Sequence, residues 1–188
     1  MKTKGKPRTP YPLLTIPKPL VLVGLMGAGK STIGKRLSSA LKIPFIDADQ
    51  EIASAAGCSI SDLFEIYGET IFRDLEQRVM LRLLSDKPCV IATGGGAFMN
   101  QAVRATIREK AISVWLKAEI DVLLERVSRR DTRPLLKSGD RRAILSRLID
   151  ERYPVYAEAD IIIDSNAGVH ESVVAAVFAA LKEKFGHG

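Results

Sequence analysis

The stretch from Gly24 to Thr32 reads GLMGAGKST and fits the pattern G-x-x-x-x-G-K-[ST]. It follows an apolar run at 20–23 and opens residues 30–42, whose hydrophobic spacing predicts a helix. In such a strand–loop–helix unit the glycines let backbone N–H groups face a phosphate, and the helix N-terminus adds a favourable dipole. The sequence therefore predicts a domain built around a nucleotide-binding loop.

The residue types in this loop predict individual roles. Lys30 is expected to reach the β- and γ-phosphates, and the Ser31 hydroxyl is expected to ligate Mg²⁺. The predicted nucleotide-binding residues of the loop are Gly27, Ala28, Gly29, Lys30, Ser31 and Thr32.

A magnesium site usually includes a carboxylate, and two apolar runs end in one, at Asp47 and Asp164. We expect Asp47 near the metal, because its strand comes directly after the loop's helix, and Asp164 on an outer strand. Asp49 would then face the acceptor of the phosphoryl group. At the start of the pattern DQEIA it fits a helix N-cap equally well, so both interpretations stay open.

Strand-like and helix-like segments alternate along the whole chain. Continuous hydrophobicity predicts strands buried on both faces of a parallel sheet at 20–23, 44–47, 89–93, 111–116 and 160–164. Helical patterns cover 30–42, 49–56, 60–85 with a break near Gly68, 100–109, 119–129, 140–153 and 169–185. This alternation predicts an α/β sandwich, and the polar stretch 128–140 is a candidate lid.

Composition narrows the class of protein. The 188 residues and 46% hydrophobic content fit one domain, placed at 18–188, and no apolar run is long enough to span a membrane. Of the net charge of +6, +5 lies in residues 1–20, so the remaining chain is nearly neutral and a nucleic-acid function is disfavoured.

The N-terminal segment 1–17 is basic and rich in proline, and this composition predicts a disordered tail. Two distant cysteines predict buried thiols and a cytoplasmic location, and we expect a monomer.

Three further features suggest the acceptor side of a site. Arg73 and Glu76 stand three residues apart on one helix face, where the carboxylate could orient the guanidinium. The TGGGA stretch at 93–97 ends a buried strand with three glycines, and Arg152 follows an arginine-rich helix. A surface ion pair, a tight turn and a solvated arginine are the ordinary explanations of these three features taken singly.

Taken together, GLMGAGKSTIG, FIDAD, IFRDLE, TGGGA, RPLL and RYPVYAEAD resemble the shikimate kinases in order and spacing, over about residues 18–184. The resemblance implies ATP-dependent phosphorylation of the shikimate 3-hydroxyl, within chorismate and aromatic amino-acid biosynthesis. It also implies a P-loop kinase fold similar to nucleoside monophosphate kinases: a three-layer sandwich around a five-stranded parallel sheet, with a substrate-binding region at 49–76 and a lid at 128–140.

Site roles carry over from this resemblance residue by residue. Asp49 would bind the shikimate hydroxyls and orient the acceptor, and Arg73 and Arg152 would bind the carboxylate. Gly94, Gly95 and Gly96 would form the substrate-facing loop, and Arg133 would close over the phosphates. Arg126 matches the adenine-stacking arginine, with Arg129 and Arg130 as rivals, while Ser165 replaces the usual threonine before Asn166. The implied catalytic residues are Lys30, Asp49 and Arg133.

Other functions compete with this interpretation. Gluconate kinase has a similar fold and an acidic substrate, although the DAD, IFRDLE and TGGGA stretches argue against it. A nucleotide-dependent switch protein would have no use for Asp49 or Arg133. Among the remaining residues, Trp115 is expected in the core, Tyr153 and Tyr156 are expected to pack, and His170 lacks partners at metal-ligand spacing.

Overall fold

The computed structural model describes residues 14–84, 87–129, 140–166 and 170–185. The five strands are β1 (Leu20–Val23), β2 (Phe45–Asp47), β3 (Val90–Ala92), β4 (Ile112–Lys117) and β5 (Ile161–Asp164). The helices are α1 (Lys30–Leu41), α2 (Ala48–Ala56), α3 (Ile60–Leu83), η1 (Ala97–Met99), α4 (Gln101–Lys110), α5 (Ile120–Ser128), α6 (Arg141–Tyr156) and α7 (His170–Phe185).

The strands form one parallel sheet in the order β2-β3-β1-β4-β5. β1 lies in the middle, where Val21 pairs with Ile91 on one side and with Ser113 on the other. All four residues of β1 are buried, which explains its uninterrupted hydrophobicity. β5 lies at one edge of the sheet, so Asp164 is on an outer strand as predicted.

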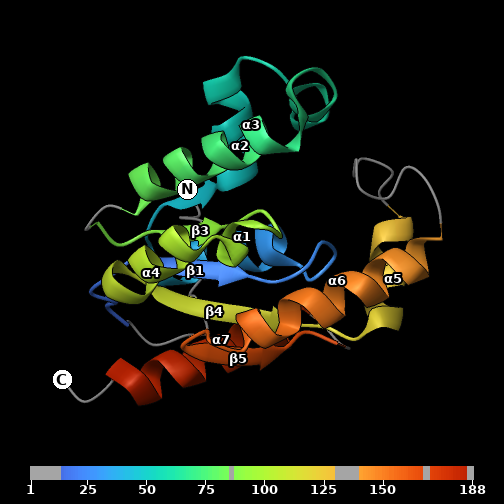
Figure 1. Cartoon of the computed structure of the whole chain (residues 1–188). Helices are drawn as coiled ribbons and strands as arrows, with labels where there is room; N and C mark the ends of the chain where they lie inside the picture. Colours follow the sequence, from blue (N-terminus) through green and yellow to red (C-terminus); the bar gives the residue numbers. More distant parts are fainter. Residues whose placement is uncertain (1–13, 85–86, 130–139, 167–169, 186–188) are drawn as a thin grey trace, which may run out of the picture.

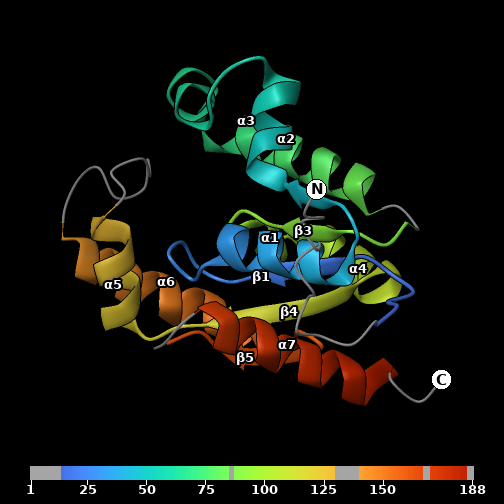
Figure 2. The ribbon, with the colours of Figure 1, turned by 180° about the vertical axis from the view of Figure 1, so that it is seen from behind.

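Helices cover both faces of the sheet. α4 and α6 lie on the face toward the viewer in Figure 1, and α1 and α7 lie on the opposite face (Figure 2). α5 packs on α6, and α1 packs on α7. The predicted three-layer sandwich with a five-stranded parallel sheet is confirmed.

The order in which strands are added to the sheet reverses at β1. β2 and β3 lie on one side of β1, and β4 and β5 lie on the other side. Open α/β sheets bind ligands at such a reversal, beyond the carboxyl ends of the strands. The segments that leave this end of the sheet are the Gly24–Gly29 loop, Asp47, the loop at 93–96 and Ser165.

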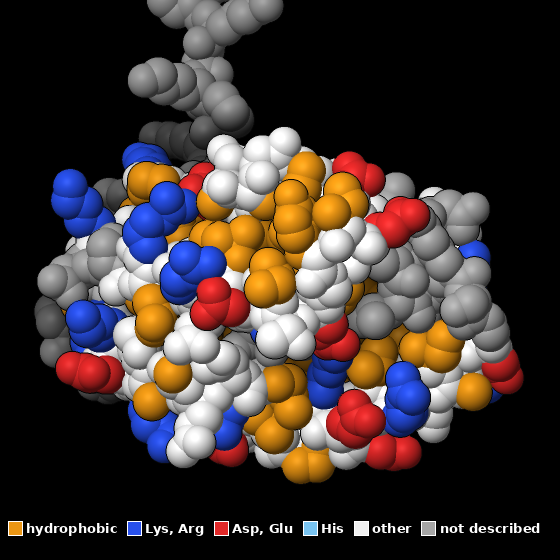
Figure 3. Space-filling model, turned by 45° about the horizontal axis from the view of Figure 1, so that its top comes forward, with side chains coloured by type: hydrophobic (Ala, Val, Ile, Leu, Met, Phe, Trp, Pro, Cys, Tyr) orange, Lys and Arg blue, Asp and Glu red, His pale blue; other side chains and the backbone are white. Residues whose placement is uncertain are grey.

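α2 and α3 stand beyond the sheet and have a small core of their own, made of Ile52, Leu63, Phe72 and Val79. α3 is broken at Gly68, whose positive φ of 78° confirms the predicted break. Side chains around this break are exposed, Ile66 by 66%, and hydrophobic atoms reach the surface at this end of the molecule (Figure 3). The predicted substrate-binding region is thus a separate layer laid against the edge of the sheet.

The observed helix and strand boundaries lie within two residues of the predicted ones, except at the end of α6, and the predicted tail also differs. α6 continues through Pro154 to Tyr156 instead of ending at 153, because buried Tyr156 anchors its last turn. The tail prediction is wrong at its C-terminal end: Ile16, 2% exposed, belongs to the hydrophobic core and Leu14 packs against that core. The apolar side chain of Ile16 holds this end of the proline-rich, basic segment against the core. Residues 1–13 lie outside the described part of the chain.

The predicted lid lies almost wholly outside the described residues. Of 128–140 the structure describes Ser128, which ends α5, Arg129, and Asp140, whose side chain caps α6 by accepting the N–H of Arg142 at 2.8 Å. Within the described ranges, no helix combines the length and the apolar character needed to cross a bilayer.

Candidate active site

The phosphate-binding loop ends at the start of α1, and no described side chain caps the first backbone N–H groups of this helix. Gly29 is the N-cap of α1 and has φ of 95°, a left-handed conformation that favours glycine. No side chain caps this end, and the first turn of α1 contains no acidic residue. The N–H groups and the positive end of the helix dipole are therefore left to an anion.

Lys30 lies across this loop. The residue is 9% exposed, and its Nζ donates to the carbonyl oxygens of Gly24 at 2.7 Å and Leu25 at 2.9 Å. The ammonium group is thus folded over the loop that precedes it. A phosphate held by the loop would meet a positive charge already in place.

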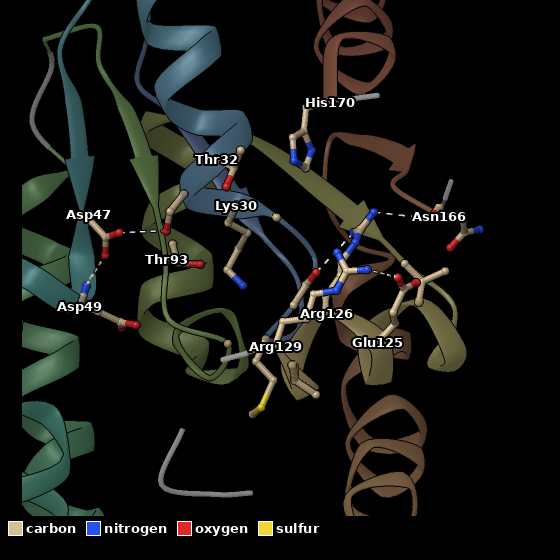
Figure 4. A pocket seen from close by; sticks show the side chains of 17 residues that line it. Lys30, Thr32, Asp47, Asp49, Thr93, Glu125, Arg126, Arg129, Asn166 and His170 are labelled. Atoms are coloured by element: carbon tan, nitrogen blue, oxygen red, sulfur yellow. Dashed lines mark hydrogen bonds and ion pairs between the residues drawn. The ribbon is translucent and has the colours of Figure 1, made fainter. Parts of the chain in front are cut away.

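A cavity of about 630 Å³ opens in front of the loop (Figure 4). In this view Asp47 and Asp49 lie to one side, Lys30 is in the middle, and Arg126 and Asn166 lie to the other side. Of the predicted nucleotide-binding residues, those lining the cavity are Gly27, Gly29, Lys30, Ser31, Thr32 and Arg126. The volume is in the range of small-molecule ligand pockets.

Two predicted nucleotide contacts are not found among these lining residues. Ala28 is buried, and its carbonyl oxygen accepts a hydrogen bond from the Ser165 hydroxyl at 3.0 Å. This bond ties the loop to the residue after β5, and the nucleotide contact of Ala28 stays a prediction. Arg133 lies outside the described residues, so its contact with the phosphates stays a prediction.

Arg126 is held against the loop by three oxygens. Its guanidinium is 3.3 Å from the Gly27 carbonyl oxygen, 3.4 Å from the Ser165 hydroxyl and 3.4 Å from the Asn166 carbonyl oxygen. Burial lowers the pKa of Arg126. Its rival Arg129 also lines the cavity but is an exposed residue that pairs with Glu125 at 2.6 Å, and Arg130 lies outside the described residues.

Ser31 and Asp47 meet as predicted for a magnesium site. The Ser31 hydroxyl donates to Asp47 Oδ2 at 2.9 Å, which brings two side chains with hard oxygen atoms together beside the loop. The described residues contain no cluster of three or more His, Cys, Asp or Glu able to hold a metal ion by themselves. A single carboxylate and a hydroxyl fit Mg²⁺, which commonly takes its other ligands from phosphates and water.

The two aspartates of the DAD motif have different roles in the backbone. Asp47 is the N-cap of α2, and its Oδ1 accepts the N–H of Asp49 at 3.2 Å. Asp49 stands inside the first turn of this helix. The alternative in which Asp49 is the N-cap is therefore wrong, because the helix begins two residues earlier than DQEIA suggested.

A second, smaller pocket of about 70 Å³ adjoins the cavity in front of the loop. The larger space is called the nucleotide cavity below, and the smaller one the acceptor pocket. Both are lined by Met26, Asp49 and Gly95, so these residues stand where the two spaces meet. The other residues lining the smaller pocket are Ile60, Phe64, Phe72, Arg73, Glu76, Gly94, Gly96 and Arg152. All six residues predicted to bind the acceptor are therefore brought together around one space.

Arg73 and Glu76 form the predicted ion pair, with Arg73 Nη1 2.7 Å from Glu76 Oε2. Glu76 is 2% exposed, and its Oε1 has no hydrogen-bond partner among the described residues. Burial raises the pKa of the Glu76 carboxyl, and the charge and hydrogen bond of Arg73 offset only part of this rise. Burial alone would lower the pKa of Arg73, but Glu76 and Glu69 outweigh it and raise that pKa.

The three glycines allow these charged groups to approach the backbone. A Cβ at Gly94 would lie 2.8 Å from Glu76 Oε1 and 2.9 Å from Asp49 Oδ1, and one at Gly96 would collide with the Arg73 guanidinium. Arg152, largely buried, donates from Nη1 to the Gly95 carbonyl oxygen at 2.9 Å. Both arginines thus border the same short loop, although they come from α3 and α6.

His170 is a cavity residue that the sequence did not identify. It begins α7 and lines the nucleotide cavity together with Thr93 and Asn166. Burial, followed by the charges of Arg36 and Arg126, lowers the pKa of its imidazole. It stands at no metal-ligand spacing from another described histidine or cysteine. Its position just after the last strand, at the ligand-binding edge of the sheet, was the available signal.

The fold and the site define an ATP-dependent kinase of the P-loop type, with a separate pocket for a small acceptor next to the nucleotide cavity. The family model described as "Shikimate kinase" matches residues 26–182, well over half of the chain. The chain belongs to the shikimate kinase family.

Individual relatives agree with the family match. A shikimate kinase of Brucella canis is 59% identical over 144 residues, 77% of this chain and 72% of the relative. A shikimate kinase of Mesorhizobium japonicum is 53% identical over 167 residues, 89% of this chain and 82% of the relative. The solved structure of a shikimate kinase from Acinetobacter baumannii in complex with shikimate is 34% identical, has a TM-score of 0.86 and aligns over 89% of this chain and 94% of that chain.

Proposed function

We propose that this chain transfers the γ-phosphoryl group of ATP to the 3-hydroxyl of shikimate, giving shikimate 3-phosphate and ADP, on the route to chorismate and the aromatic amino acids. The observation that carries the proposal is the junction of two pockets at Asp49. One pocket is lined by the phosphate-binding loop, and the other combines two arginines with a buried carboxylate. A small acidic polyol is the kind of acceptor that such a second pocket suits.

ATP lies in the larger cavity, with its phosphates over the N-terminus of α1. The uncapped N–H groups hold phosphate oxygens, and the Lys30 ammonium stabilises the negative charge on the transferring group. Arg126, fixed between the loop and Asn166, lies on the adenine side. The predicted lid arginine, Arg133, adds a positive charge and helps to exclude water, which would otherwise compete as acceptor.

Mg²⁺ accompanies ATP in this proposal. Ser31 and Asp47 would hold the ion, whose chemistry is to neutralise phosphate charge. The capping bond to Asp49 N fixes the orientation of the Asp47 carboxylate before any ion binds. Asp47 thereby combines a structural role with the proposed ligand role.

Asp49 orients the acceptor hydroxyl and takes its proton. It borders both pockets, so a hydroxyl held by its carboxylate would face the transferring phosphoryl group. Glu76 Oε1, which lies with Asp49 Oδ1 against Gly94, offers a further acceptor for a ring hydroxyl. Two carboxylates side by side suit a ligand with several hydroxyl groups.

Arg73 and Arg152 bind the acceptor's carboxylate. A guanidinium presents paired N–H donors that match the two oxygens of a carboxylate, and lysine cannot reproduce this fork. Glu76 holds Arg73 and the Gly95 carbonyl oxygen holds Arg152, so both groups are oriented before the acceptor arrives. Folding has therefore already ordered these two side chains, so acceptor binding loses little of their conformational entropy.

We propose that the enzyme works as a monomer in the cytoplasm, where ATP is available and where free thiols such as Cys58 and Cys89 persist.

The experiment that tests this function is an ADP-release assay with shikimate, quinate, gluconate and nucleoside monophosphates as acceptors. Shikimate should have the highest kcat/KM of the panel. A shikimate analogue with an uncharged amide in place of the carboxylate should be a poor substrate, because both arginines lose their partner. Equal activity with the amide would exclude the arginine clamp, and a preference for gluconate would point to the rival kinase.

A further inference from the structure

Tyr156 is buried behind the acceptor pocket and is not among its lining residues. It is 0% exposed, and its ring packs in a cluster with Phe98, Trp115 and Tyr153, at centroid distances of 6.3, 5.9 and 6.2 Å. Packing alone explains the ring, but it does not explain where the hydroxyl points. A buried tyrosine hydroxyl needs a hydrogen-bond partner, and the partner found here belongs to the site.

The hydroxyl of Tyr156 donates to the carbonyl oxygen of Gly95, the glycine at the meeting point of the two pockets. The same oxygen accepts Arg152 Nη1 at 2.9 Å. A carbonyl oxygen has two lone pairs, so this single atom uses both to hold the two side chains. Arg152 and Tyr156 stand four residues apart and therefore lie on one face of α6.

This arrangement fixes the acceptor loop relative to α6. A Cβ at Gly95 would lie 3.3 Å from Arg152 Nη1, so the loop backbone and the guanidinium are already in close contact. Without the second donor, the Gly95 carbonyl would be held by Arg152 alone. Arg152 would then have to restrain the loop and bind the acceptor at the same time.

We propose that the Tyr156 hydroxyl is a positioning group for the acceptor: by holding the Gly95 carbonyl from behind, it sets the place of Arg152 and of the glycine loop. The inference rests on the proposed role of Arg152 as a carboxylate ligand. Burial raises the pKa of Tyr156 to about 12, so the hydroxyl keeps its proton and remains a donor throughout the pH range of an assay.

Tyr153 provides a matched control from the same helix. Its hydroxyl also donates to a backbone carbonyl, that of Ala118, and its ring contacts Trp115 edge-on at 4.9 Å. Neither Tyr153 nor Ala118 lines the acceptor pocket. Replacing either tyrosine by phenylalanine removes one hydroxyl and leaves the ring, so the two variants differ in which carbonyl loses a donor.

The test measures both Michaelis constants, kcat and the melting temperature for Tyr156→Phe, Tyr153→Phe, Arg152→Lys and the double variant Tyr156→Phe/Arg152→Lys. Tyr156→Phe should raise the shikimate KM by about three- to tenfold, as expected for one lost hydrogen bond, and leave the ATP KM unchanged. Tyr153→Phe should leave the shikimate KM unchanged. The double variant should fall well short of the product of the single effects, because both changes act on one contact.

The outcomes separate this inference from the proposed function. An unchanged shikimate KM in Arg152→Lys contradicts the arginine clamp itself. A raised KM in Arg152→Lys with a normal KM in Tyr156→Phe overturns the inference, and so does full multiplication of the two effects in the double variant. An equal loss in both phenylalanine variants would indicate packing only. If Tyr156→Phe is heat-labile, shikimate binding measured by calorimetry in the cold, without ATP, gives the same comparison.

Discussion

Asp47 accepts the backbone N–H of Asp49 through Oδ1, at 3.2 Å, and accepts the Ser31 hydroxyl through Oδ2, at 2.9 Å. One carboxylate therefore ties the start of α2 to the start of α1. Since Asp47 provides the helix cap, the carboxylate of Asp49 is not needed for that purpose. A change at Asp49 can thus be interpreted as a change at the junction of the two pockets.

Asp49→Asn should reduce turnover by about 10²-fold or more, the range for loss of a general base, with an almost unchanged ATP KM. Its melting temperature should change little because the cap remains. The matched control is Glu51→Gln, which removes a charge from the same first turn but at a partly exposed residue paired with Arg82 at 2.9 Å. Steady-state kinetics of both variants check this, and normal turnover in Asp49→Asn would rule out the proposed role.

Lys30→Ala should lower turnover by about 10³-fold, because the ammonium acts on charge that develops in the transition state. Lys35→Ala is the control, since Lys35 stands on the same helix, is exposed and lies over the Phe45 ring. Circular dichroism should show both variants folded. A folded Lys30→Ala enzyme with near-normal turnover would contradict the phosphate-loop assignment.

Arg73→Lys should raise the shikimate KM by the equivalent of roughly 1.5–3 kcal/mol, the value of a charged hydrogen bond, and leave the ATP KM in place. Lysine keeps the charge but loses the fork held by Glu76 and Glu69. Arg78→Lys, at an exposed arginine of α3 paired with Asp74, should behave like wild type. Equal changes in both Michaelis constants would indicate general damage to the site instead of a lost acceptor contact.

Asp160 gives a pH dependence of stability away from the site. Burial alone would raise the pKa of its carboxyl, but hydrogen bonds from Ser113 and Lys184 outweigh burial and lower that pKa. The resulting stabilisation is present above the unfolded-state pKa and is lost as the pH falls through the folded-state pKa. Asp160→Asn should therefore lower the melting temperature at neutral pH, and the difference from wild type should shrink in acid. A constant difference across this titration would argue against the ionised form as the stabilising one.

Ile16 tests where the packed body begins. Ile16→Ala should reduce the free energy of unfolding by about 2–4 kcal/mol, the usual cost of deleting a buried isoleucine. Leu14→Ala, at a partly buried residue against the same core, should cost clearly less. Chemical denaturation measures both, and kinetic constants should stay normal in each variant. No loss of stability in Ile16→Ala would mean that this segment does not pack on the body in solution.

The helices and strands and the nucleotide-binding loop follow from the amino-acid sequence alone. Hydrophobic runs mark all five strands, and the loop is one continuous segment whose function depends on its own backbone, on Lys30 and on Ser31. Ordered motifs also determined the family, as the matching family model confirms. Each strand, the loop and each single motif is local, so neighbouring residues carry the information.

Packing of the elements against one another sets which side chains of different elements touch. It made Asp47 the helix cap, turned Ala28 toward Ser165, buried Glu76 behind Arg73 and placed His170 in the nucleotide cavity. It also brought the Tyr156 hydroxyl to Gly95, 61 residues away in the chain. No local pattern specifies such contacts, because they depend on how α3, α6 and the sheet pack together, and a polar group takes its partner from whatever packing places beside it.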